Sequence, residues 1–233
     1  MRTIGLLGGM SWESTVLYYE QINHRVKAQL GGLHSAKVVL YSVNFHDIEV
    51  LQRQGDWEAA GQALAIAAQS LEAAGAEGLV ICTNTMHKVV PAIEAATQLP
   101  ILHIADATAA AIKAQNLQTV GLLGTQFTMA EAFYKDRLSH QHGLAVQIPT
   151  ASDREIIHRI IYDELCLGKI QSASRAAYLR IIDTLKEMGA EAIIAGCTEI
   201  TLLVQQSDLD IPLFDTTALH AAAAVDWALA PSA

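Results

Sequence analysis

Basic residues are scarce in this chain. Lys and Arg number 15 among 233 residues, against 24 Asp and Glu, and the formal net charge is −9 at pH 7. The few basic residues form no cluster, and nucleic-acid binding needs a concentrated basic surface. The composition therefore argues against nucleic acid as a partner.

Long apolar runs and cysteines are also few. No stretch reaches the roughly 18 apolar residues of a membrane-spanning helix, and the first residues lead into glycines rather than a signal sequence. The three cysteines, Cys82, Cys166 and Cys197, lack CxxC spacing, and the nine histidines lack the HExxH pattern. These absences predict a cytoplasmic protein with no membrane partner, no disulfide framework and no metal site.

Short Val, Ile and Leu runs alternate with longer segments of helical apolar spacing. This alternation is typical of α/β folds with buried parallel sheets. The hydrophobic fraction of 52% is ample for such a core. The predicted strands cover residues 3–7, 37–43, 78–82 and 101–103 in the first half, and 119–123, 145–148, 191–195 and 213–214 in the second.

Three sequence features recur at a spacing of 112 to 116 residues. The run Gly5-Leu6-Leu7-Gly8 reappears at 121–124, the segment 75–78 reappears at 189–192, and Pro100 reappears as Pro212. Recurrence at a nearly constant spacing indicates a duplicated unit. We predict two similar α/β lobes, 1–114 and 115–233, with chain ends that cross over. A pseudo-twofold relation would place the active site in the cleft between them, at the carboxyl ends of strands.

Cys197 follows Gly196 at the end of an apolar run and precedes a segment typical of a helix start. A thiol at a helix N-terminus has its thiolate stabilised, so its pKa is expected to fall from about 8.5 toward neutrality. Such a thiol would act as a base or nucleophile. The alternative is a buried core cysteine. A structural role is also the interpretation for Cys82 and for Cys166, which falls in a helix expected over 156–167.

Polar residues follow the matching strand of the first half. Thr83, Asn84 and Thr85 offer hydroxyl and amide groups beside the N–H groups of a helix start, which suits a carboxylate, although plain helix capping explains them equally. The glycine-rich turn 8–11 predicts close backbone approach to a small ligand, or merely a tight turn capped by Ser11. Thr125 follows the equivalent strand of the second half. Asp106 and Asp215 are expected to orient helices or substrate.

The sequence resembles the aspartate/glutamate racemase family of cofactor-independent amino-acid racemases. The resemblance spans essentially the whole chain. It rests on residues 4–11, on the Cys-Thr-Asn-Thr-Met-His segment 82–87, on Glu164-Leu165 with Gly168, and most specifically on 196–200. Within the family it is similar to the enterobacterial type described as specific for L-aspartate and L-glutamate, or as broader in substrate.

The resemblance implies an isomerase in which a cysteine from each lobe flanks the α-carbon of an amino acid. One thiol removes the α-proton and the other returns a proton to the opposite face. Here Thr83 replaces the first thiol, which leaves Cys197 as the main base. No pyridoxal cofactor or other cofactor is implied. The residues assigned to substrate binding are Met10, Gln52, Asn84, Thr85, Thr125 and Thr198.

Two other functions remain open at this stage. A single-thiol site also resembles the decarboxylases of the same superfamily, which protonate a carbanion from one face. The missing thiol equally suits an amino-acid-binding domain without catalysis. The oligomeric state is open as well, because Tyr18, Tyr19 and Trp57 fit either a core or a homodimer interface.

Overall fold

A computed structural model describes residues 1–231. The chain divides into two compact units, one made of Met1–Ile104 together with the chain from His220 onward, the other of Ala105–Leu219. Each unit has its own parallel sheet with helices around it. The predicted α/β class with two parallel sheets is confirmed.

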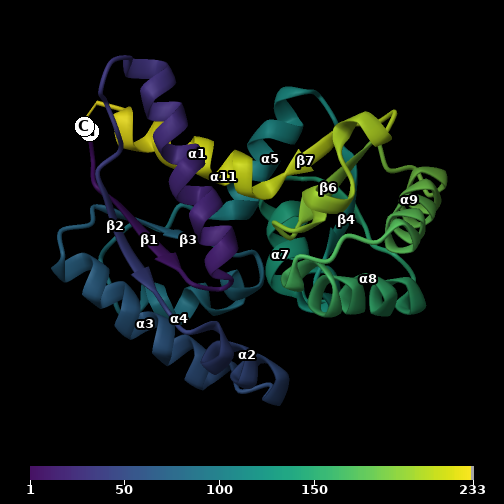
Figure 1. The fold of residues 1–233 in the computed structure, drawn as a ribbon, viewed down its shortest axis with the longest axis horizontal. Helices are drawn as coiled ribbons and strands as arrows, with labels where there is room; N and C mark the ends of the chain where they lie inside the picture. Colours follow the sequence, from purple (N-terminus) through teal and green to yellow (C-terminus); the bar gives the residue numbers. More distant parts are fainter. Residues whose placement is uncertain (232–233) are drawn as a thin grey trace. The chain divides into compact units, whose positions relative to one another are not determined.

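The first unit is built on three parallel strands in the order β2-β1-β3 (Figure 1). The expected strand over 101–103 was wrong. Only Ile101 forms an isolated bridge, to Leu79, because helix α5 already begins at Ile104. The elements of this unit are β1 (Ile4–Gly8), α1 (Trp12–Leu30), β2 (Val38–Ser42), α2 (Phe45–Gln54), α3 (Trp57–Ala73), β3 (Gly78–Ile81), η1 (Thr85–Val89), α4 (Val90–Glu94) and most of α11 (Thr216–Leu229).

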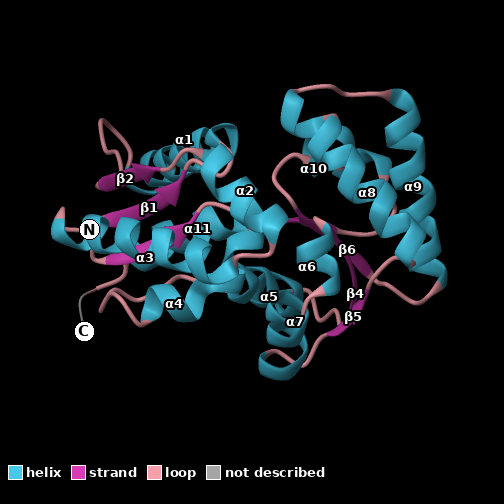
Figure 2. Ribbon diagram, turned by 90° about the horizontal axis from the view of Figure 1, so that it is seen from below, coloured by secondary structure: helices cyan, strands magenta, loops and turns pink. Residues whose placement is uncertain are grey.

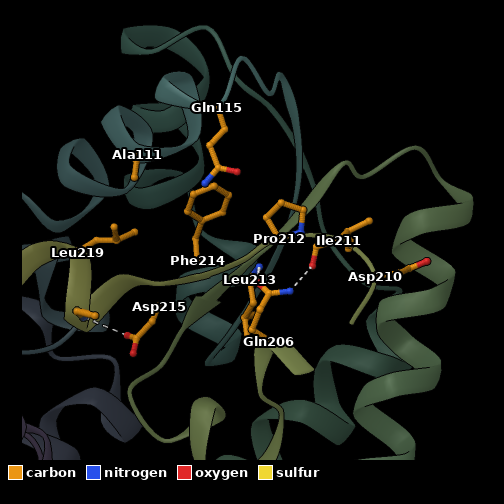
Figure 3. A pocket seen from close by; sticks show the side chains of 11 residues that line it. Ala111, Gln115, Gln206, Asp210, Ile211, Pro212, Leu213, Phe214, Asp215 and Leu219 are labelled. Atoms are coloured by element: carbon orange, nitrogen blue, oxygen red, sulfur yellow. Dashed lines mark hydrogen bonds between the residues drawn. The ribbon is translucent and has the colours of Figure 1, made fainter. Parts of the chain in front are cut away.

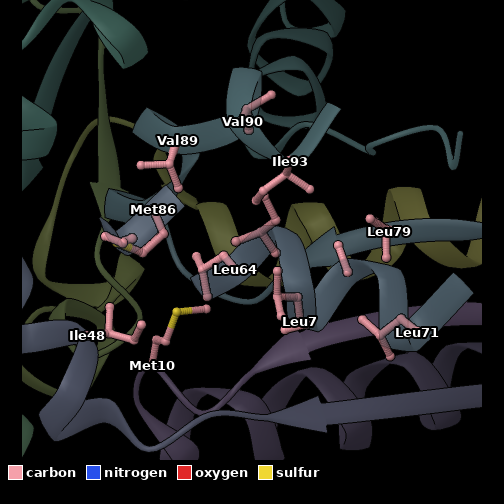
Figure 4. Packing of buried hydrophobic residues seen from close by; sticks show 14 of the residues in the cluster. Leu7, Met10, Ile48, Leu64, Leu71, Leu79, Met86, Val89, Val90 and Ile93 are labelled. Carbon is pink, nitrogen blue, oxygen red and sulfur yellow. The ribbon is translucent and has the colours of Figure 1, made fainter. Parts of the chain in front are cut away.

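Alternate side chains of this sheet point to opposite faces, and both faces are buried. Leu7, Leu79 and Ile81 pack with α2, α3 and α4 in the cluster drawn in Figure 4. On the other face, Cys82 lies in a cluster with residues of α1 and α11, including Tyr18. The expectation that Cys82 belongs to the core is confirmed.

The turn after β1 depends on glycine. Gly9 has a φ of +90°, and a Cβ at this position would lie 2.3 Å from the carbonyl oxygen of Val43. The Gly9 N–H donates to Thr15 Oγ1 at 2.8 Å, and the Ser11 hydroxyl accepts from the N–H of Ser14 at 3.2 Å. Ser11 is therefore the N-cap of α1, as predicted, and the backbone passes very close to β2.

The second unit has four parallel strands in the order β5-β4-β6-β7, and α8 and α9 pack against β4 (Figure 2). Its elements are α5 (Ile104–Ala114), β4 (Thr119–Gly124), α6 (Gln126–Ala130), α7 (Ala132–Asp136), η2 (Arg137–Gln141), β5 (Ala145–Gln147), α8 (Ala151–Asp163), η3 (Leu165–Leu167), α9 (Ser172–Glu187), β6 (Ala192–Gly196), α10 (Ile200–Leu203), η4 (Gln206–Asp208), β7 (Leu213–Asp215) and the start of α11. A single helix was expected over 156–167. Instead α8 ends at Asp163, and Cys166 lies in a separate short turn of helix.

The boundary between the units lies between residues 104 and 105, with the chain returning to the first unit at His220. The sequence repeat gives a boundary near residue 114 instead. The two boundaries differ because a repeat is defined by spacing along the sequence, whereas a compact unit is defined by contacts between residues. Among residues 1–231, no helix combines the length and apolar character needed to cross a bilayer.

Candidate active site

The first group of candidate residues follows β3. Asn84 and Thr85 are buried, whereas Thr83 is half-buried. The helical segment that follows, η1, has five residues, and the Asn84 side chain at its N-cap forms no capping hydrogen bond. Plain helix capping therefore does not account for Asn84.

His87 fixes the backbone of Thr83. Its Nε2 accepts the N–H of Ile104 at 3.2 Å, so this nitrogen carries no proton. Its Nδ1 then donates to the carbonyl oxygen of Thr83 at 2.8 Å. The hydrogen bonds thus select a neutral imidazole that holds Thr83 in place. The structure thus makes His87 a direct support of the Thr83 backbone.

Gln52 and Met10 both lie beside Met86. The Gln52 side chain is buried, and its Nε2 lies 2.9 Å from the sulfur of Met86. The Met10 side chain packs in the same cluster as Ile48 and Met86 (Figure 4) and is 4% exposed. The Met10 side chain thus packs in the core of the first unit, and its contact with substrate stays a prediction.

The second group follows β6. Cys197 is half-buried, and its Sγ donates to Glu199 Oε2 at 3.0 Å. The Thr198 hydroxyl accepts from Thr217 Oγ1 at 3.2 Å. Thr125, at the end of β4, caps α6 and accepts from the N–H of Thr128 at 3.3 Å. The hydroxyls of Thr125 and Thr198 are thus held in fixed orientations at strand ends.

The expected lowering of the Cys197 pKa was wrong. Burial of the sulfur raises the pKa of this thiol well above its usual value, and the negative charge of Glu199 raises it further. The following helix, α10, has only four residues, so its dipole gives the thiolate little support. Cys197 is a protonated thiol at neutral pH, with a carboxylate placed to accept its proton.

Replacing Glu199 with glutamine should move the pKa of Cys197 downward. The amide keeps the size of the side chain but removes a negative charge that disfavours the thiolate. The pH dependence of iodoacetamide alkylation at Cys197, followed by peptide mass spectrometry, should shift to lower pH by about one unit, or tenfold in rate at fixed pH. Glu164→Gln is the control, because Glu164 Oε2 accepts from Ser174 Oγ at 2.5 Å. An unchanged or upward-shifted midpoint in Glu199→Gln contradicts this account.

Two further ionisable side chains, Cys166 and Tyr178, interact electrostatically with Cys197. Cys166 affects the pKa of the Cys197 thiol, and Tyr178 is influenced by Cys197, Cys166, Glu164 and Glu199. The sequence interpretation of Cys166 as merely structural omitted this proximity. The sequence analysis did not identify Tyr178. The one available signal was its spacing of four residues from Ser174 on α9, which places the two side chains on the same face of the helix.

Asp106 and Asp215 have structural partners within the second unit. Asp215 accepts from the N–H groups of Thr217 and Ala218 at the start of α11, and burial raises its pKa. Asp106 forms a bidentate ion pair with Arg137, and the two Arg137 hydrogen bonds each measure 2.7 Å. Both residues therefore orient helical segments, which is one of the roles expected for them.

A pocket of the second unit lies along β7, between α5 and α11 (Figure 3). Phe214 and Gln115 point into it, and Gln206 closes one side through its hydrogen bond to the carbonyl oxygen of Ile211 at 3.1 Å. None of the residues predicted to bind substrate lines it. Over residues 1–231 there is no group of three or more His, Cys, Asp or Glu side chains arranged to hold a metal ion.

Both units are parallel α/β units with polar side chains after their strands, which is where α/β proteins bind ligands. A family model described as Asp/Glu/Hydantoin racemase matches residues 7–224. The chain therefore belongs to this family, and it is an isomerase of the amino-acid racemase class.

Individual relatives agree with this assignment. A candidate Asp/Glu racemase from Yersinia pestis is 60% identical with a TM-score of 0.93, covering 99% of this chain and 100% of its own. An aspartate racemase homologue from Pyrococcus horikoshii is 32% identical with a TM-score of 0.84, covering 98% and 99%. The broad specificity amino-acid racemase RacX of Bacillus subtilis is 24% identical over 239 residues, covering 97% of this chain and 98% of the relative.

Proposed function

We propose that this racemase acts on an acidic amino acid, L-aspartate or L-glutamate, or on a broader set that includes them, with Cys197 as its main base. The observation that carries the proposal is the hydrogen bond from the Cys197 thiol to the Glu199 carboxylate at the end of β6. A thiol paired with a buried proton acceptor is equipped to lose its proton and then to accept another. The names of the similar proteins support the choice of substrate.

The proton steps follow from this pair. Glu199 Oε2 takes the proton of the Cys197 thiol, which gives a thiolate and a carboxylic acid. The thiolate then removes the α-proton of the amino acid and leaves a planar carbanion. A proton must return from the opposite face, and we assign this step to the Thr83 hydroxyl, which relays a proton from water. Glu199 then releases its proton to solvent, where it neutralises the hydroxide left by that water, and Cys197 keeps the α-proton, so the resting thiol and carboxylate are restored.

The raised pKa of Cys197 suits this chemistry. The α-proton of an amino acid is far less acidic than an ordinary thiol, so a thiolate of high pKa is the stronger base toward it. Few molecules carry the thiolate at any moment, and Glu199 offsets this by providing a nearby place for the proton. The negative charge that develops on the substrate needs fixed dipoles, which we assign to Asn84, Thr85 and Thr198.

Substrate contacts are assigned in the same way. The hydroxyls of Thr125 and Thr198 and the amide of Asn84 would bind the α-carboxylate, while Gln52 and the Met10 backbone would contact the remaining substrate atoms. These steps use only groups of the chain itself, and independence from pyridoxal phosphate and metal stays a prediction. A cytoplasmic location and pairing as a homodimer likewise stay predictions.

The test is α-deuterium incorporation in heavy water, measured by mass spectrometry over a panel of L- and D-amino acids. We expect exchange with aspartate or glutamate and the appearance of the opposite enantiomer. Binding of an amino acid without exchange would show a binding domain instead. Release of carbon dioxide from substituted malonates, with no exchange in the panel, would show a decarboxylase.

A further inference from the structure

Three histidines and a tyrosine are buried together in the first unit. His87, His103 and His220 are at most 7% exposed, and Tyr18 is fully buried. The ring centroids of His87 and His103 lie 4.5 Å apart, and those of His87 and His220 lie 5.8 Å apart. Burying an imidazole is costly unless its nitrogens are hydrogen-bonded. The hydrogen bonds of this cluster therefore show what it holds in place.

His220, in α11, has both ring nitrogens hydrogen-bonded. Its Nε2 lies 2.5 Å from the carbonyl oxygen of Leu102, and because a carbonyl can only accept, Nε2 carries the proton. In a neutral ring Nδ1 then accepts the hydroxyl of Tyr18, at 2.8 Å. The two bonds direct the N–H of His220 at the backbone of Leu102.

The residues just before α5 connect this N–H donor to the end of β3. The carbonyl of Leu102 accepts from His220, and two residues further on the N–H of Ile104 donates to Nε2 of His87 at 3.2 Å. Nδ1 of His87 in turn donates to the carbonyl oxygen of Thr83 at 2.8 Å. A continuous path of hydrogen bonds and backbone therefore leads from His220 to Thr83.

This path acts on backbone position rather than on a proton of the substrate. Both nitrogens of His87 and both nitrogens of His220 are engaged in the bonds just described, so neither ring exchanges a proton with substrate. What the path fixes is the carbonyl of Thr83, and with it the backbone from which the Thr83 hydroxyl projects. Such placement matters, because a misplacement of about 1 Å can slow a reaction about a hundredfold.

We propose that His220 is a positioning residue for the Thr83 hydroxyl. It acts through residues 102–104 and His87. The inference rests on the proposed role of Thr83 in returning a proton to the carbanion. No proton moves along the path during the reaction, since its hydrogen bonds serve only to hold the Thr83 backbone. Loss of the His220 donor should therefore impair the step assigned to Thr83 and spare the step assigned to Cys197.

The experiment compares His220→Phe with the matched control Tyr18→Phe. His220→Phe keeps a planar ring but removes the donor to the Leu102 carbonyl. Tyr18→Phe leaves that donor in place and removes only the partner of Nδ1. The two substitutions thus disturb the same buried pair, but only one of them breaks the path to Thr83.

Two quantities are measured on each variant. Without substrate, the backbone amide resonance of Asn84 is recorded by two-dimensional proton–nitrogen NMR, since Asn84 shares its peptide group with the Thr83 carbonyl. With L-aspartate or L-glutamate in heavy water, the α-deuterated amino acid is separated by configuration. Retention reports return of a deuteron from Cys197, and inversion reports return from Thr83. The ratio of inversion to retention does not depend on the fraction of protein that is folded.

In His220→Phe the Asn84 resonance should shift, and the ratio of inversion to retention should fall by about tenfold. In Tyr18→Phe both should match the unaltered protein, although its melting temperature should fall because Nδ1 of His220 loses its donor. If His220→Phe does not fold, the double variant with Tyr18→Phe carries the same expectations as His220→Phe. Removing both members of a buried hydrogen-bonded pair costs less stability than removing one.

Other outcomes overturn the proposal. An unchanged Asn84 resonance in folded His220→Phe would mean that His220 does not act on Thr83. A shifted resonance with an unchanged ratio would mean that the path does not direct the Thr83 hydroxyl, and an equal fall of the ratio in Tyr18→Phe would indicate a general loss of packing. The NMR measurement needs no substrate, so a shifted resonance in a protein that exchanges no amino acid would refute the proton-return role of Thr83 while showing that His220 holds its backbone.

Discussion

Alanine at position 197 should lower α-deuterium incorporation by about a thousandfold, since a positioned general base contributes roughly 10²- to 10⁴-fold. The thiol accounts for the whole of this effect in the proposed mechanism, because no other group there removes the α-proton. Cys197 lies after β6 rather than within it, so the sheet itself keeps its side chains. The variant should therefore fold, as checked by circular dichroism and thermal unfolding.

Cys82→Ala is the control for this result. Cys82 is fully buried in the core of the first unit, and its substitution should cost about 1 kcal/mol of unfolding free energy while leaving exchange nearly unchanged. Near-normal exchange in Cys197→Ala would remove this residue from the chemistry. Equal losses in both variants would point to a general effect of altered packing.

The two enantiomers should exchange at unequal rates, because Thr83 and Cys197 differ as acids. A threonine hydroxyl cannot readily act as a base, whereas the thiolate can. The enantiomer whose α-hydrogen faces Cys197, which we expect to be the L form, should be deprotonated at least tenfold faster at saturation. The position of equilibrium is unaffected, so the difference appears only in exchange rates, or in turnover and KM together.

Substitutions at Thr83 sharpen this prediction. Thr83→Cys supplies a second thiol and should raise exchange of the slow enantiomer by about tenfold or more, with a smaller gain for the fast one. Thr83→Val keeps the shape of the side chain but removes the hydroxyl, so return of a proton to the carbanion should slow. Equal deuteration of both enantiomers by the unaltered protein would contradict the single-base mechanism.

The strands were predictable because buried parallel strands leave an unambiguous signature of Val, Ile and Leu runs. The strand ends then placed Thr83 and Cys197, since each follows the last apolar residue of its strand. The expected strand at 101–103 failed because sequence alone did not show that α5 begins at Ile104. Cys166 was placed in a helix because apolar spacing continues past the true end of α8 at Asp163.

The electrostatics of the site could not be predicted from the sequence. The direction of the Cys197 pKa depends on the length of α10 and on the orientation of one Glu199 oxygen, and neither follows from residue order. The His87 tautomer depends on the position of the Ile104 N–H, 17 residues away. Tyr178 was not predicted because its nearness to Cys197 becomes apparent only when every element is in place.

The first unit needs residues from both ends of the chain for its core, so it is completed late in synthesis. Ala224 and Val225 of α11 pack with Leu6 and Val80, and His220 Nε2 donates to the carbonyl oxygen of Leu102 at 2.5 Å. The ribosome therefore makes the second unit before it makes residues 220–229 of α11, which close the first. The first unit is thus completed only once α11 has been made, and until then α1 alone covers this face of its sheet.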